Sequence, residues 1–269
     1  MKTPARVLIV AGSDSGGGAG IQADIKTVTA LGAYAMTAIT AVTVQDTTGV
    51  HGFYPVPPEI VADQIRAVLG DIGADAIKTG MLVSADCVET IAEALAPYPS
   101  VPLVVDTVMI AKGGTALLDD AGVDAMKARL FPIAALITPN APEAARLAGI
   151  AVQSPDDLVS AGLKLRELGA RAVLVKGGHV AGDIVTDVLV DRTGVRMFTA
   201  PRIESASTHG TGCTLASAIA TGLAQGMTLH DAVTRARGFV QEAIRTGLPF
   251  GRGTGPINHL HAIKAYKAN

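Results

Sequence analysis

The chain has 269 residues, of which 49% are hydrophobic and 17% are charged, and this composition excludes an intrinsically disordered protein. Its formal net charge is −2 and no basic block stands out, so we expect neither a nucleic acid nor a membrane as a partner. It has only two cysteines, Cys87 and Cys213, which excludes a disulfide framework and favours a reducing, cytoplasmic setting.

Short apolar runs alternate with longer segments rich in alanine and leucine along the chain. The first run, residues 7–11, is too short for a signal sequence and suits a strand buried on both faces. Further strands are predicted at 38–44, 75–79, 102–106, 134–138, 172–176, 184–190 and 195–199. Helices are predicted at 21–32, 57–70, 84–96, 120–130, 140–148, 155–168, 212–226 and 228–245.

This alternation predicts an α/β fold, with a mostly parallel sheet covered by helices on both faces. The last two strands, joined by the short segment 191–194, are expected to form an antiparallel hairpin at one edge. No long linker or internal repeat divides the chain, so we expect one domain over residues 1–269. No apolar stretch is long enough to span a bilayer.

A glycine-rich segment, residues 12–20, lies between the first strand and the first helix. Its backbone N–H groups could face a ligand at the start of that helix. The spacing fits neither common phosphate-binding motif, because the dinucleotide fingerprint needs a glycine where Ile21 stands and the chain contains no Gly-Lys-Ser/Thr tripeptide. An ordinary flexible turn explains this segment equally well.

A second polar, glycine-rich stretch starts the helix predicted near residue 212. The N–H groups of Gly210, Thr211, Gly212 and Cys213 would converge at the helix N-terminus, which favours an anion such as phosphate. Cys213 stands in the first turn, where a thiol pKa falls below about 8.5, so we expect a thiolate or a ready proton acceptor. A structural cysteine behind an ordinary loop remains the alternative.

Polar side chains also follow three of the predicted strands. Asp106, Asn140 and Lys176 lie at or just beyond strand ends, and Glu143 follows Asn140 by three positions. In open α/β sheets this edge carries the ligand, and Mg²⁺ prefers few protein oxygens together with water and phosphates. The pattern therefore fits a metal–phosphate site, although Asn140 and Glu143 also fit an ordinary capping box.

Two remaining features favour structural roles. His259 and His261 could share a metal, but no further ligands accompany them, so we expect them to pack or to lie on the surface. Cys87 stands early in a predicted helix and is expected to be half-buried structure.

Eight segments, taken in order, resemble the hydroxymethylpyrimidine/phosphomethylpyrimidine kinases of thiamine biosynthesis, which belong to the ribokinase superfamily. They are GSDSGGGAGIQADIKT, AVTVQDTTGV, KTGML, DTVMIAKGG, ITPNAPEA, VKGGH, THGTGCT and GTGPINHLHA. The match runs from about residue 6 to about residue 262, so from the length of the chain we expect no fused thiamine-phosphate synthase. It implies a ribokinase-like three-layer sandwich with a small β flap, and a homodimer.

The resemblance also implies the reaction. Such enzymes use ATP and Mg²⁺ to phosphorylate 4-amino-5-hydroxymethyl-2-methylpyrimidine and then its monophosphate. Cys213 resembles the base that takes the proton from the attacking group, and Gln45 resembles the residue that hydrogen-bonds the aminopyrimidine. An amide side chain suits that task because it donates and accepts at once.

Further roles carry over by resemblance. The anion hole would be formed by Gly210, Thr211 and Gly212. The other substrate-binding positions would be Gly12, Asp24, Val42, Met81 and Val108. The Mg–ATP side would hold Asp106, Asn140, Glu143, Lys176, Thr208 and His209, with Asp106 and Glu143 as the metal ligands.

Two alternatives remain. A pyridoxal or pyridoxine kinase of vitamin B6 salvage is the nearest, since some relatives accept both rings. Some of those relatives carry a second cysteine on the lid over the site, and the matching stretch here, residues 109–112, has none. A catalytically silent ligand-binding regulator would be expected to lack Cys213 or the Gly210–Gly212 segment, and both are present.

Overall fold

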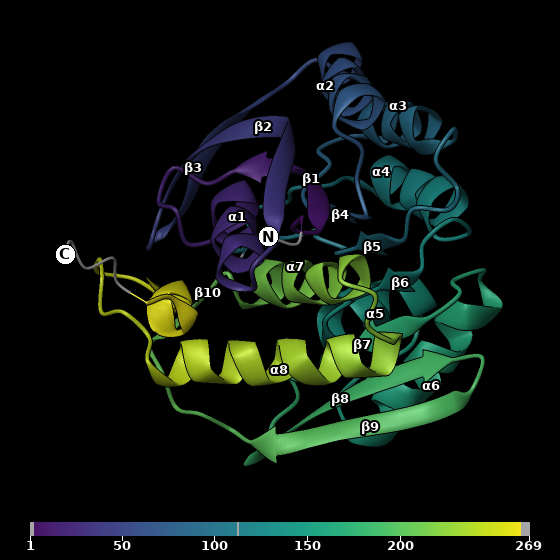
Figure 1. The fold of residues 1–269 in the computed structure, drawn as a ribbon. Helices are drawn as coiled ribbons and strands as arrows, with labels where there is room; N and C mark the ends of the chain where they lie inside the picture. Colours follow the sequence, from purple (N-terminus) through teal and green to yellow (C-terminus); the bar gives the residue numbers. More distant parts are fainter. Residues whose placement is uncertain (1–2, 112, 265–269) are drawn as a thin grey trace.

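In the computed structural model, which describes residues 3–111 and 113–264, two layers of helices enclose a nine-stranded sheet (Figure 1). Lys112 of the DTVMIAKGG segment lies outside the described residues. The strands of the sheet are β1 Arg6–Ser13, β2 Tyr34–Asp46, β3 Gly49–Pro55, β4 Ala76–Thr79, β5 Leu103–Val105, β6 Leu136–Ile137, β7 Val173–Val175, β8 Ile184–Asp191 and β9 Gly194–Pro201.

The helices are α1 Gly20–Ala30, α2 Pro58–Asp71, α3 Ala85–Leu95, α4 Asp120–Ala125, α5 Ala141–Ala148, α6 Pro155–Glu167, α7 Thr211–Ala224 and α8 Leu229–Arg245. A π-helical turn, Met126–Leu130, continues α4, and a 3₁₀ turn spans His259–Ala262. A separate two-stranded sheet pairs β10 Ser207–His209 with β11 Gly255–Pro256. No helix among the described residues combines the length and the apolar character needed to cross a bilayer.

The strand order is β3-β2-β1-β4-β5-β6-β7-β8-β9. Strands β2, β1, β4, β5, β6 and β7 run parallel, whereas β3, β8 and β9 pair antiparallel at the two edges. The chain passes from β1 to β2 on one side and then returns to β4 on the other. The strand order therefore reverses between β1 and β4, which is where open α/β sheets bind their ligands.

The predicted α/β architecture is confirmed, and every predicted strand and helix is present with its ends moved by a few residues. The expected edge hairpin is β8–β9. The sequence analysis missed β3, which completes a flap with the end of β2, and the short pair β10–β11. The β3 sequence GVHGFYP holds two glycines and a terminal proline, residues that are depleted in strands, so it lacks the alternating apolar pattern.

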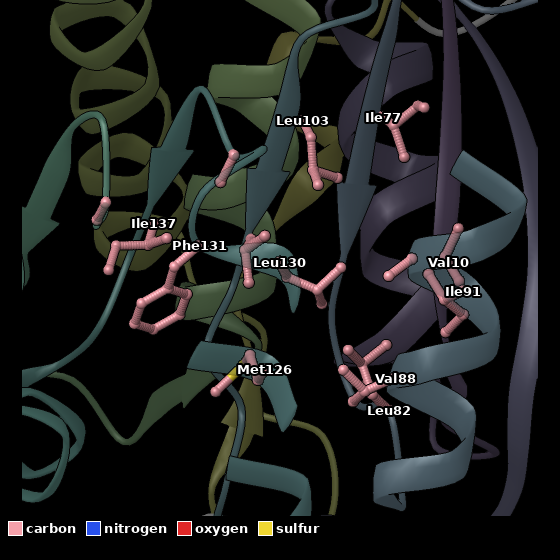
Figure 2. Close-up of a cluster of buried hydrophobic side chains, with 14 of the residues drawn as sticks. Val10, Ile77, Leu82, Val88, Ile91, Leu103, Met126, Leu130, Phe131 and Ile137 are labelled. Carbon is pink, nitrogen blue, oxygen red and sulfur yellow. The ribbon is translucent and has the colours of Figure 1, made fainter. Parts of the chain in front are cut away.

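Strand β1 shows why the sheet is covered on both faces. Leu8 and Val10 enter one buried cluster, and Val7, Ile9 and Ala11 enter the other, because successive side chains of a strand point to opposite faces. The first cluster packs under α2 to α6, and Figure 2 shows its side chains between the strands and α3. The second lies under α1, α7 and α8, and α7 and α8 run side by side in Figure 1.

His259 fastens the C-terminal segment to the start of α7. Its Nε2 lies 2.8 Å from the Thr214 hydroxyl, and its side chain is buried. His261 packs against the ring of Phe239, with ring centroids 4.5 Å apart. The expected packing role is confirmed for both histidines. Burial, with smaller contributions from the charges of Lys26 and His261, lowers the pKa of His259 to about 4.

We expect this histidine to make the fold sensitive to acid. The pKa of His259 is about 4 in the folded chain and about 6.5 in the unfolded chain. Between pH 6.5 and pH 4 the unfolded chain therefore binds more protons, and the folding stability falls as the pH is lowered. The expected loss between pH 7 and pH 5 is about 2 kcal/mol. Urea unfolding at both pH values should show a smaller pH dependence in His259→Gln.

Candidate active site

A cavity of about 890 Å³ opens at the carboxyl edge of the parallel strands, next to the reversal between β1 and β4. This volume is typical of a site for small ligands. The cavity brings together most of the site residues predicted from the sequence. Those that line it are Gly12, Gln45, Met81, Asp106, Val108, Asn140, Glu143, Lys176, Thr208, His209, Gly210, Thr211, Gly212 and Cys213.

Two residues predicted for the pocket wall lie elsewhere, and those predictions are corrected. Asp24 of α1 is completely buried behind the wall, where it accepts hydrogen bonds from Lys78 at 2.8 Å and Ser217 at 2.6 Å. Val42 of β2 is 52% exposed on the outer face of the flap. Alternate residues of a strand face opposite sides, and the neighbouring Thr43 takes the inner position.

Lys78 lines the cavity but was not predicted as a site residue, although the sequence pattern around it could have indicated such a role. It is fully buried in β4, pairs with Asp24 and lines the cavity. Burial alone would lower its pKa, but the charges of Asp24 and Asp106 raise it, so the ammonium group keeps its proton. A lysine inside an otherwise apolar strand is the pattern that could have revealed it, because a buried charge requires a partner.

The start of α7 faces the cavity through a backbone turn that only glycine can form. Gly210 has a φ of 84°, a conformation that other residues rarely adopt. A Cβ atom at this position would also collide with the carbonyl oxygen of Gly18 in the glycine-rich loop. The loop and the helix start therefore interlock, which directs the first N–H groups of α7 at the cavity.

Cys213 is half-buried in the first turn of α7. Burial raises the pKa of its thiol to about 12, and the charges of Asp24 and Asp106 add to this, whereas Lys78 and the N–H of Gly20 oppose it. The expected lowering of this pKa is wrong, because desolvation outweighs the helix N-terminus. In the chain alone the group is a thiol at neutral pH.

The raised pKa predicts a pH-dependent chemical reactivity. Only the thiolate reacts with iodoacetamide, and a pKa of about 12 leaves about one thiolate in ten thousand at pH 8. The rate of Cys213 alkylation should therefore rise about tenfold per pH unit between pH 8 and pH 10. Mass spectrometry of the modified peptide measures this rate, with Cys213→Ala as the blank. A rate that is already constant above pH 8 would contradict the raised pKa.

Asp106 and Lys176 form a buried ion pair across the sheet edge. The Lys176 Nζ lies 2.9 Å from Asp106 Oδ1, and the hydroxyl of Thr138 donates to the same oxygen at 3.2 Å. Burial alone would raise the pKa of Asp106, but Lys176 and Lys78 hold it below its usual range. Asp106 therefore keeps its negative charge inside the cavity.

Asn140 and Glu143 serve the helix and the cavity together. The Asn140 side chain accepts from the Glu143 N–H at 2.9 Å, and Glu143 accepts from the Asn140 N–H at 2.9 Å, so the capping box at the start of α5 is real. Burial, assisted by the charge of Asp106, raises the pKa of Glu143, although Lys176 and these hydrogen bonds oppose the shift.

Gln45 reaches the cavity at a β-bulge. The pairing of β2 with β3 slips between Val44 and Gln45, and bulges of this kind re-aim a side chain. Ser15 of the glycine-rich loop stabilises the bulge, because its hydroxyl donates to the Gln45 carbonyl at 2.7 Å and accepts from the Gln45 N–H at 2.9 Å. The amide of Gln45 therefore lies on a backbone that is held from two sides.

The N–H groups of the glycine-rich loop, residues 12–20, form hydrogen bonds within the loop itself. The carboxylate of Asp14 accepts N–H groups from Gly16 at 2.8 Å, Gly18 at 3.0 Å and Ala19 at 2.8 Å. These N–H groups are therefore occupied by the chain's own carboxylate, and the segment is neither a free phosphate cradle nor a loose turn.

His209 lies 3.0 Å from Asp14 and 3.3 Å from the Gln45 amide through its Nε2. Its predicted place on the Mg–ATP side is corrected: the ring faces Gln45. The prediction failed because Thr208 and His209 precede the anion-binding turn in sequence, whereas the β10–β11 pairing directs the His209 side chain toward the glycine-rich loop.

Comparison with known proteins gives consistent findings. The chain matches the family model for phosphomethylpyrimidine kinase over residues 14–258. It is 50% identical over 261 residues to the hydroxymethylpyrimidine/phosphomethylpyrimidine kinase of Streptomyces coelicolor, covering 97% of this chain and 96% of that one. It is 54% identical over 259 residues to the thiamine biosynthesis bifunctional protein ThiED of Geobacter sulfurreducens, covering 96% of this chain and 53% of that protein. The chain thus spans about half the length of this relative.

The fold is also that of a solved kinase. The structure of an ADP complex of Bacillus subtilis pyridoxal kinase superposes with a TM-score of 0.89 at 33% sequence identity, covering 96% of this chain and 98% of that one. This chain therefore shares its fold with a kinase whose structure was solved as an ADP complex.

Proposed function

The chain belongs to the phosphomethylpyrimidine kinase family, and from that premise we propose that it phosphorylates 4-amino-5-hydroxymethyl-2-methylpyrimidine and then its monophosphate, using ATP. The family and its ribokinase-like fold make the chain a phosphotransferase. One observation carries the substrate assignment. A single cavity joins the amide of Gln45 and an apolar wall to the helix start that bears Cys213 and to the Asp106–Lys176 pair.

The pyrimidine end of the cavity combines an apolar wall with one amide. Met81 and Val108 belong to a small apolar cluster with Ala41 and Leu117, and Gly12 brings the backbone of β1 against it. A flat, partly apolar ring fits such a wall, and the Gln45 amide can donate and accept at the edge of an aminopyrimidine.

The transfer end supplies positive charge and a proton acceptor. Phosphoryl transfer depends mainly on positioning and charge neutralisation. The N–H groups at Gly210, Thr211 and Gly212 would face the transferred group, with Lys176 beside it. Cys213 would accept the proton of the attacking hydroxyl, and then that of the monophosphate in the second step. Because the raised pKa keeps this group a thiol at neutral pH in the chain alone, the role requires its deprotonation in the loaded site, which the charge of Lys78 favours.

The nucleotide would lie toward β6 and β7, beyond Asn140 and Lys176. Asp106 and Glu143 fit Mg²⁺, because both line the cavity and a divalent cation would stabilise the Glu143 carboxylate, whose pKa burial and the charge of Asp106 raise. Within residues 3–111 and 113–264, no group of three or more histidine, cysteine or acidic side chains could hold a metal ion. Mg²⁺ would therefore be held by one or two carboxylates together with water and phosphates. Mg²⁺ bound there would neutralise phosphate charge.

The assembly and setting are part of the proposal. We expect residues 1–269 to act as one kinase domain in the cytoplasm, and two copies to pair through the flap. Val42, Val44 and Tyr54 expose apolar surface on its outer face, with Val44 63% and Tyr54 72% exposed. Sedimentation should give a dimer, and Val44→Asp should weaken it.

A pyridoxal kinase is the second candidate, because the solved pyridoxal kinase shares the fold so closely. The identity is lower than that to the Streptomyces pyrimidine kinase, and Met109, Ile110 and Ala111 provide no lid cysteine. Formation of ADP should be measured side by side with the hydroxymethylpyrimidine and with pyridoxal. A higher kcat/KM for pyridoxal would overturn the proposal.

A further inference from the structure

We propose that Asp14 and His209 lock the side-chain amide of Gln45 in one orientation, so that the site selects a 4-aminopyrimidine over its 4-oxo analogue. This inference rests on the proposed function, which assigns Gln45 to the pyrimidine ring. A glutamine alone does not discriminate between the two rings, because rotating its amide exchanges donor and acceptor. Selection therefore requires a second residue that fixes the rotation.

The key atom is Nε2 of His209. It lies 3.0 Å from Asp14 Oδ2 and 3.3 Å from the end of the Gln45 amide. One ring nitrogen carries either a hydrogen or a lone pair, and it therefore cannot accept from the amide while it donates to the carboxylate.

The contact with Asp14 determines whether Nε2 of His209 carries a hydrogen or a lone pair. Its carboxylate is 2% exposed and accepts three backbone N–H groups from the glycine-rich loop. Burial would raise its pKa, but the hydrogen bonds from His209, Ala19 and Gly16 hold the pKa below its usual value. An ionised acceptor at 3.0 Å demands a donor, so Nε2 bears the hydrogen. This holds for the neutral ring and for its cation alike.

The amide must then turn its oxygen toward His209. With its nitrogen there, two donors would face each other at 3.3 Å. Amide oxygen and nitrogen have nearly the same shape, so their assignment follows from the hydrogen-bond network. With the oxygen toward His209, the amide nitrogen faces Thr43 Oγ1 at 3.3 Å, and that hydroxyl donates onward to the Ser13 carbonyl at 2.8 Å. Every contact in this network is then between a donor and an acceptor.

The surrounding backbone prevents the pair from moving away. A Cβ atom on Gly18 would collide with the His209 ring, so the ring lies directly against the loop. Ser15 holds the Gln45 backbone at the bulge from the same loop. The glycine-rich segment therefore fixes both the histidine and the glutamine.

The consequence is a fixed order of donor and acceptor on the cavity side of Gln45. A 4-aminopyrimidine presents an amino donor beside a ring-nitrogen acceptor, whereas the 4-oxo ring presents an acceptor beside an N–H donor. The ring cannot turn over to compensate, because its hydroxymethyl group must reach Cys213. A site with fixed polar groups strongly rejects the mismatched ring.

The test compares kcat/KM for 5-hydroxymethyl-2-methylpyrimidine with a 4-amino or a 4-oxo group. We expect the wild-type protein to prefer the 4-amino ring by about a hundredfold or more. In His209→Leu, which removes the donor, this ratio should fall to within about tenfold, and His209→Gln, which restores an N–H, should recover part of it. Met81→Leu, which alters only the apolar wall, should affect both rings equally and keep the ratio.

An unchanged ratio in His209→Leu, with both rings slowed alike, would overturn the inference while leaving the proposed function intact. Failure of the wild-type protein to phosphorylate the 4-amino ring would instead defeat the proposed function. A measurement on the wild-type protein covers the case of a variant that does not fold. Nitrogen-15 NMR of the histidine side chains should show a hydrogen on Nε2 of His209, and a bare Nε2 would overturn the lock directly.

Discussion

Replacing Cys213 by alanine is expected to abolish most turnover while pyrimidine binding persists. The substitution removes the proton acceptor at the start of α7, and general-base catalysis contributes on the order of 10²–10⁴-fold to a rate. The ring would still contact Gln45, Met81 and Val108, so the dissociation constant should change by less than about tenfold. Steady-state kcat and calorimetric binding of the pyrimidine measure the two quantities separately.

Cys87→Ala provides the matched control. Cys87 is buried in α3 and belongs to the cluster of Leu8 and Val10, on the opposite face of the sheet from α7. Its substitution likewise removes one thiol and leaves a methyl group, so it should lower stability slightly and leave kcat unchanged. Near-normal turnover in Cys213→Ala would show that Cys213 is not the proton acceptor. A joint loss of binding and turnover would point instead to a role in shaping the cavity.

Asp106→Asn is expected to lower kcat on the order of 10²–10³-fold and to raise the Mg²⁺ concentration needed for half-maximal activity. The variant keeps the shape but removes the charge that pairs with Lys176 at 2.9 Å. It also removes one of the two carboxylates that would hold the metal. Breaking a buried ion pair from one side can cost about 3–5 kcal/mol, so thermal unfolding must be followed in parallel.

Asp75→Asn separates this effect from a general loss of stability. Asp75 pairs with Arg6 at 2.7 Å just before β4, at the opposite end of the strands from the cavity. The pair is about one-third exposed, and an exposed pair of this kind contributes little to stability. We expect unchanged kinetics in this variant. An Asp106→Asn variant that matches the wild type both in kcat and in the Mg²⁺ concentration for half-maximal activity would exclude Asp106 from the metal–phosphate site.

The sheet and the position of the site were predictable because they depend on local patterns. Apolar runs such as Val7–Ala11 alternate with helical spacing, and the polar residues Asp106, Asn140 and Lys176 stand where those runs end. Parallel strands place all their carboxyl ends at one edge, so the convergence of these residues followed from order alone.

The errors concern side chains whose place depends on tertiary packing. Asp24 turns inward because Lys78, from a neighbouring strand, requires a buried counter-ion. Val42 turns outward because the pairing of β2 with β3 sets which face is inside, and β3 was not predicted. The thiol pKa of Cys213 depends on desolvation by the whole fold, which no local pattern reports. His209 turns toward Gln45 through a two-residue pairing with β11, remote in sequence.

Mass spectrometry of the product formed from hydroxymethylpyrimidine and excess ATP tests the central claim most directly. We expect one phosphoryl group and then a second to be added to the same molecule, and both additions to be slowed strongly in Cys213→Ala because one site performs both steps. Pyridoxal treated in the same way should gain little phosphate. A single addition that stops at the monophosphate, or efficient phosphorylation of pyridoxal alone, would contradict the account.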